Sequence, residues 1–207
     1  LGVDFAPTGR RHQRIDPWYK SSYSGTPVAE DVEGATAICW STTGAYAIST
    51  LWTLWRTEAF ALGEVPRGGG SAGTFAAVWT NVAAHAFSAA SGSWYAITLP
   101  EPSIGGLASD GLCLVWTSGH AYAFDPSPGA WTSLDLGAPG GVSGSGSENV
   151  GMVWGGQRAQ AYSQITDTWA VLDTSTPVVG GNANGEVAIL WTFNEGWAFN
   201  AASGLWA

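Results

Sequence analysis

Short apolar segments alternate with turn-forming residues along most of the chain. Apolar and polar positions alternate over four to six residues, as in Ala121-Tyr122-Ala123-Phe124, and turns rich in Gly, Ser, Asp and Pro separate these segments. Such alternation predicts short, half-buried β-strands. No stretch of ten or more residues shows a convincing 3.6-residue period, so we expect almost no helix.

The strand pattern repeats with a period that tryptophan marks. A tryptophan is followed fifteen residues later by a second one in five units, which begin 37 to 39 residues apart: Trp40/Trp55, Trp79/Trp94, Trp116/Trp131, Trp154/Trp169 and Trp191/Trp206. Four short strands in a unit of this length are typical of a β-propeller blade. Because these ten tryptophans recur at fixed positions, we interpret them as packing residues. Three others, Trp18, Trp52 and Trp197, lie outside the pattern and are better candidates for ligand contact.

We therefore predict a single all-β domain, a five-bladed β-propeller of four-stranded antiparallel blades. The approximate blades are residues 27–63, 64–100, 101–137, 138–174 and 175–207. The fifth unit stops where its outer strand should begin, and residues 1–8 contain a strand-like segment. We expect residues 2–6 to complete the last blade, which would close the ring and remove an exposed edge. Residues 9–26 are expected to form an irregular insertion, and a sixth blade would require residues 7–30 to form a degenerate unit.

The second half of the repeat resembles kelch-type propellers. Ala123-Phe-Asp-Pro-Ser-Pro-Gly-Ala-Trp131-Thr-Ser-Leu134 is similar to the Tyr-Asp-Pro…Trp-x-x-Leu signature of that family. In the fourth unit, Gly155-Gly156, Tyr162 and Trp169 follow the family's order, whereas the other units lack the diglycine. The resemblance implies a propeller, and kelch-like propellers include protein-binding modules, sugar oxidases and lectins. Fold alone does not choose among these functions.

Composition narrows the classes of partner. Only 11% of the residues are charged, the net charge is −9, and Lys20 is the single lysine. Such a surface repels phosphate backbones and anionic membranes, so we expect neither nucleic acid nor a membrane as partner. No signal peptide or transmembrane segment is visible, and the location stays open between secreted and cytoplasmic.

The two cysteines are interpreted as free thiols. Cys39 and Cys113 lie in the first and third units, at positions where the other units carry small or medium apolar residues. Each therefore replaces a packing residue, which favours buried thiols over a disulfide.

The best candidate for a binding surface is the hairpin between the second and third strands of each unit. In a kelch-like propeller this hairpin faces the mouth of the central channel. Three titratable groups occupy the same repeat position there, and the candidate site consists of His120, Arg158 and Glu195 with Asn81, Gln157, Asn194 and Trp197. The alternative is a solvated rim without a ligand.

Catalytic and metal sites find little support in the pattern. Asp110 and Glu148 share a repeat position and are the one pair of acids suited to glycoside hydrolysis, although the pattern favours a role at a turn or strand end. His12, His85 and His120 fall at unrelated positions, so no metal site and no cofactor are expected. Our leading hypothesis is a non-enzymatic binding module with lectin-like glycan recognition. A kelch-like protein–protein scaffold is the alternative, and a glycoside hydrolase-like enzyme comes third.

Overall fold

The structure, a computed structural model, describes residues 24–137 and 141–207, which form twenty β-strands in five antiparallel sheets. Blade one contains β1 (Pro27–Glu33), β2 (Thr36–Ser41), β3 (Gly44–Ser49) and β4 (Arg56–Ala59). Blade two contains β5 (Pro66–Ala72), β6 (Phe75–Thr80), β7 (Ala83–Ser88) and β8 (Ser93–Thr98). Blade three contains β9 (Gly105–Ser109), β10 (Leu112–Trp116), β11 (His120–Asp125) and β12 (Ala130–Asp135). Blade four contains β13 (Ser143–Ser147), β14 (Val150–Gly155), β15 (Arg158–Ser163) and β16 (Thr168–Asp173). Blade five contains β17 (Gly180–Asn184), β18 (Val187–Trp191), β19 (Gly196–Asn200) and β20 (Leu205–Trp206).

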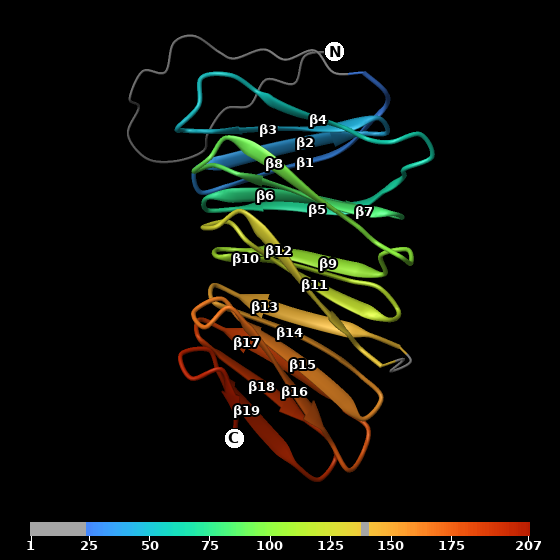
Figure 1. The fold of residues 1–207 in the computed structure, drawn as a ribbon, viewed down its shortest axis with the longest axis vertical. Coiled ribbons are helices and arrows are strands. Elements are labelled where there is room, and N and C mark those ends of the chain that lie inside the picture. Colours follow the sequence, from blue (N-terminus) through green and yellow to red (C-terminus); the bar gives the residue numbers. More distant parts are fainter. Residues whose placement is uncertain (1–23, 138–140) are drawn as a thin grey trace.

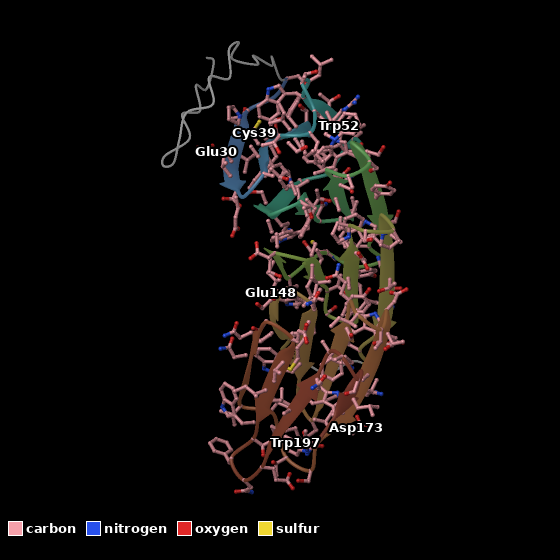
Figure 2. The ribbon with its side chains drawn as sticks, turned by 90° about the vertical axis from the view of Figure 1, so that its left-hand side faces the viewer. Glu30, Cys39, Trp52, Glu148, Asp173 and Trp197 are labelled. Atoms are coloured by element: carbon pink, nitrogen blue, oxygen red, sulfur yellow. The ribbon has the colours of Figure 1, made fainter. Side chains whose placement is uncertain are left out.

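The strands of each blade lie side by side in sequence order, as the repeat predicts. The expected all-β architecture of five four-stranded antiparallel propeller blades is confirmed, and the described residues contain no helix. The first strands of adjacent blades contact one another more extensively than the fourth strands do, so the blades fan out from an inner edge. Figure 2 shows Glu30 and Glu148 along this inner edge, with Trp52 and Asp173 toward the opposite one.

Ring closure is not part of the described structure. The blades follow one another along the long axis of the molecule, and blades one and five lie at its opposite ends (Figure 1). Blade five obtains its outer strand from β20, which pairs with β19 at the very end of the chain. The predicted closing strand at residues 2–6 and most of the predicted insertion at residues 9–26 lie outside the described residues. Within them, the propeller is an open arc.

The recurrent tryptophans pack between blades. The first tryptophan of blades one to three is buried. The second tryptophan donates its indole N–H to the preceding blade, from Trp94 to the Arg56 carbonyl (3.2 Å) and from Trp131 to the Tyr95 carbonyl (3.0 Å). Trp169 donates to the Thr132 hydroxyl and Trp206 to the Ala170 carbonyl. A residue needed once per interface therefore recurs once per repeat, whereas Trp191 of blade five is 40% exposed.

Trp52 and the two cysteines lie outside the strict pattern. The indole of Trp52 donates to the Ala89 carbonyl of blade two at 2.6 Å, so it joins blades one and two. Cys113 is fully buried and Cys39 half-buried, and both are free thiols, as expected. Burial raises the pKa of both thiols, that of Cys39 to about 11 with a further contribution from the charge of Glu30.

Candidate functional site

One side of the arc carries both the hairpins between second and third strands and the connections between blades. We call this side the hairpin rim; it comprises the hairpins near residues 42–43, 81–82, 117–119, 156–157 and 192–195 and the described parts of the connections 60–65, 99–104, 136–142 and 174–179. Backbone hydrogen bonds join the hairpins of blades one to four to connections. The Asn81 N–H donates to the Val65 carbonyl (3.0 Å), and the Thr174 N–H donates to the Gln157 carbonyl (2.8 Å). The hairpins and the connections of the rim therefore stabilise each other, and we call such a surface braced.

A hydroxyl directly after the first tryptophan shapes most of these hairpins. The Thr80 hydroxyl accepts the Ala83 N–H, and the Thr117 hydroxyl accepts the His120 N–H, each at 2.9 Å. Thr192 accepts the Glu195 N–H in blade five. Serine and threonine side chains favour turns because they satisfy nearby backbone donors. In blade four the turn contains Gly155 and Gly156 instead.

Two glutamates that sequence reasoning missed lie at the centre of the rim. The Glu64 carboxylate accepts from Thr80 (2.9 Å) and from the Ala61 N–H (2.7 Å), and its Oε1 lies 2.6 Å from His85 Nε2. Burial raises the pKa of Glu64, but the hydrogen bonds from His85, Ala61 and Thr80 outweigh it, so the pKa lies below its ordinary value. The other ring nitrogen of His85 lies 3.0 Å from Glu58 Oε1 on β4. His85 therefore joins blades one and two.

Glu101 has the corresponding role between blades two and three, in a more exposed setting. Its Oε2 accepts from the Thr117 hydroxyl (2.7 Å) and the Gly119 N–H (2.9 Å). The hydrogen bond from Thr117 is the main cause that lowers the pKa of this carboxyl. Glu64 and Glu101 both lie fifteen residues before the first tryptophan of their unit, so the repeat carried a signal that could have identified them.

The predicted site residues lie on the rim, but each is engaged locally. His120 Nδ1 lies 3.6 Å from Glu101, and Arg158 Nε lies 3.3 Å from Asp173 of its own blade. Glu195 accepts from Ser175, so each of the three titratable groups has its own neighbour. Within the described part of the chain, no hydrogen bond or ion pair joins any two of the three.

The predicted amides brace the rim as well. Asn81 Oδ1 accepts the Val65 N–H (2.7 Å), and Gln157 Nε2 donates to the Ser175 carbonyl (3.2 Å). Asn194 is exposed at the tip of the last hairpin, and its backbone N–H donates to Thr192. Trp197 is half-buried and packs against the apolar cluster between blades four and five, away from the rim surface. Whether any of these residues binds a ligand stays a prediction.

The rim also exposes apolar side chains that the pattern of titratable residues did not indicate. They lie on the hairpins and connections of blades one, two, three and five: Leu62, Val65, Val82, Ile104, Val179 and Phe193. Leu62 is fully exposed and Phe193 is 85% exposed, so neither contributes to the core. Apolar residues on a braced polar surface are typical of a site that contacts another macromolecule.

The remaining candidates for chemistry lie elsewhere. Asp110 and Glu148 occupy turns between first and second strands, at the opposite ends of the strands from the rim. No group of three or more His, Cys, Asp or Glu residues suited to a metal ion occurs within residues 24–137 and 141–207. In the same residues, no helix is long and apolar enough to cross a membrane.

Comparisons with known proteins assign the chain to no family. No family model and no curated protein matches it. Among solved structures, human WBSCR16 is 10% identical with a TM-score of 0.49, over 97% of this chain and 69% of that one. Hsv2 from Kluyveromyces lactis is 9% identical with a TM-score of 0.47, over 88% of this chain and 62% of that one. KlAtg21, solved in complex with the coiled-coil of AgAtg16, is 11% identical with a TM-score of 0.46, over 80% of this chain and 62% of that one. This chain thus spans about two thirds of the length of these proteins, and the kelch resemblance stays a prediction.

Proposed function

We propose that the chain is a non-enzymatic binding module whose hairpin rim binds a partner protein. The observation that carries the proposal is the set of exposed apolar side chains on the rim, of which Leu62, Ile104 and Phe193 are the most prominent. Burying such side chains in an interface contributes about 1.5–3 kcal/mol each when burial is complete. The braced hairpins lose little conformational freedom on binding, which supports affinity.

The polar groups of the rim would set specificity. His120, Arg158 and Asn81 present donors and acceptors between the apolar positions, and hydrogen bonds at the margin of an interface favour one partner over others. Their present neighbours, such as Asp173 and Glu101, hold them in place before a partner arrives. This arrangement provides contacts whose positions are fixed before binding.

Site-specific photo-crosslinking tests the proposal. A photoreactive residue at Ile104 is expected to capture a discrete partner from a native extract, and the Leu62→Glu substitution in the same chain should abolish the capture. The matched control is the same photoreactive residue at Ile165, an equally exposed apolar position on the opposite side of the arc. Equal capture at both positions, or none at Ile104, would overturn the protein-binding proposal.

Glycan recognition is the second candidate, and Phe193 favours it. This exposed aromatic ring is adjacent in sequence to Asn194 and close to Glu195, a combination that can stack on a sugar ring and bond its hydroxyl groups. A glycan array probed with the labelled protein should then show competable binding to one sugar class, which Phe193→Ala removes. A blank array with folded protein would eliminate this candidate.

A further inference from the structure

Blades one to four each bury one face of their second strand under the next blade. The side chains at the alternating positions of this strand are apolar and form the interblade clusters: Ile38 and Trp40, Phe75 and Trp79, Leu112 and Trp116, and Val150 and Met152. Apart from the tryptophans, which retain 6 to 8% exposure, these side chains are fully buried. The same type of interface therefore forms four times, once between each pair of adjacent blades.

The corresponding face of blade five is uncovered. Val187, Ile189 and Trp191 occupy the same positions of β18, yet they are 44%, 48% and 40% exposed. Figure 1 shows blade five at the end of the arc, with blade four on its other side. The corresponding apolar face is buried under the next blade in blades one to four. We therefore interpret the exposed face of blade five as an interface.

The repeated interface also shows what the covering surface must offer to Trp191. The ring of Trp79 lies against Gly106 of the next blade, where an added Cβ would come within 2.7 Å of it, and Trp116 lies against Gly144 in the same way. Trp40 lies against Gly69. Blade one carries Glu30 at the position of these glycines. Blade one of another copy therefore cannot cover Trp191 in the repeated manner, which argues against head-to-tail stacking of copies.

The face of blade five is instead complementary to itself. Cross-strand register places Trp191 between Gly180 and Gly196. The Trp191 ring lies over Gly180, and the Gly196 side is open, which leaves room there for a second indole. Ile189 lies between Asn182 and Ala198, and Val187 between Asn184 and Asn200. The Oδ1 of Asn182 accepts from Ser145 and that of Asn200 from the Ser203 N–H, so the amide N–H groups of these residues are the ones that can donate across a twofold axis.

Charge supports the same conclusion. None of these nine side chains is charged, although the chain carries a net charge of −9. A negatively charged face would repel a second copy of this acidic chain. Because this face is uncharged, two copies can meet here without bringing like charges together. The apolar centre with an amide margin matches the anatomy of a protein interface.

We propose that two copies of this chain associate around a twofold axis through the exposed face of blade five. Trp191, Ile189 and Val187 lie at the centre of this contact. The contact is isologous, so it closes at a dimer and does not propagate into a filament. It borders the hairpin rim only at residues 192–195 of blade five and leaves the rim of blades one to four available to a partner.

Mass measurement by light scattering after gel filtration tests the dimer over a roughly hundredfold range of protein concentration. The native chain should shift from monomer to dimer mass as concentration rises. Ile189→Asp places two like charges in the interface and should weaken association about tenfold or more. Ile165→Asp, which changes an equally exposed isoleucine of blade four, is the matched control and should leave the dimer intact.

Hydrogen exchange of the native chain provides a second readout that needs no variant. Amides of β18 and β19 should become protected as the dimer forms, while those of β2 and β3 should not change. A monomer mass at every concentration, assemblies larger than a dimer, or equal loss in both variants would each overturn the proposal.

Discussion

The most constrained side chain on the rim is His85, which lies between two carboxylates. Its ring nitrogens lie 3.0 Å from Glu58 and 2.6 Å from Glu64, and the imidazole is 5% exposed. Its two partners come from β4 and from the connection to blade two. Those contacts depend on how two blades meet.

Glu64→Gln tests this cluster. Because the folded-state pKa of Glu64 lies below its ordinary value of 4.5, the ionised carboxylate stabilises the fold above that value, and this contribution is lost as pH falls through the folded-state pKa. We expect the variant to be about 2 kcal/mol less stable at pH 7, and the difference to vanish in acid. Urea unfolding as a function of pH measures it. Glu101→Gln, at an exposed carboxyl, is the control and should have a smaller effect; a pH-independent difference would contradict the argument.

The two thiols differ in accessibility, and labelling can resolve them. Burial and the charge of Glu30 raise the pKa of Cys39 to about 11, and Cys113 is fully buried. We expect slow labelling of Cys39 alone in the native protein, faster with rising pH, and labelling of Cys113 only on unfolding. Glu30→Gln should accelerate Cys39 labelling at pH 8 because it removes the repelling charge. Rapid labelling of both thiols would show that the interfaces open freely.

At the scale of single elements, glycine on the first strand of a blade allows a tryptophan ring of the preceding blade to approach closely. Gly106 on β9 faces the Trp79 ring of blade two, and Gly144 on β13 faces Trp116 of blade three. The sequence did not indicate which ring each glycine meets, because that ring belongs to a different repeat.

Gly106→Ala should therefore destabilise the protein although alanine is tolerated in strands. Its Cβ would come within 2.7 Å of two ring atoms of Trp79, and relieving this overlap costs about 1–3 kcal/mol. Gly141→Ala is the control, because an added Cβ there meets no atom within 4 Å. Thermal unfolding should show a lower Tm for the first variant and little change for the second. Similar Tm values for both would contradict the tryptophan–glycine packing.

At the scale of the whole molecule, stability should vary along the arc. Blade three is covered on both faces, and every residue of β10 is buried, whereas β18 of blade five alternates between buried and exposed. In repeat architectures each unit is stabilised mainly by its neighbours. Blades one and five each have a neighbour on one side only within the described structure, and β18 is more exposed than β2, so blade five should open first.

Hydrogen exchange at low protein concentration measures this gradient. Amides of β10 and β11 should exchange most slowly, and those of β18 and β19 should exchange fastest among the central strands. The comparison is internal because the strands occupy equivalent positions of the repeat. Identical exchange in all five blades would mean that the arc opens as a single cooperative unit.

The sequence by itself determined the strands, their grouping into five blades and the packing role of the repeated tryptophans. These are properties of local alternation and of a period, and both are visible without knowing any contact. It also indicated that His120, Arg158 and Glu195 share one side, because equivalent repeat positions recur on the same side of successive blades. The neighbours of these residues, Glu101, Asp173 and Ser175, came only from the structure.

Only the tertiary structure decided which faces are covered. Val187, Ile189 and Trp191 continue the same apolar pattern as Leu112, Leu114 and Trp116, yet the first set is exposed and the second is buried. Burial depends on whether another blade lies above the strand, and the pattern within a strand carries no record of that neighbour. For the same reason, the open arc, the contacts of His85 with Glu58 and Glu64, and the exposed apolar residues of the hairpin rim can be recognised only from the arrangement of the blades in space.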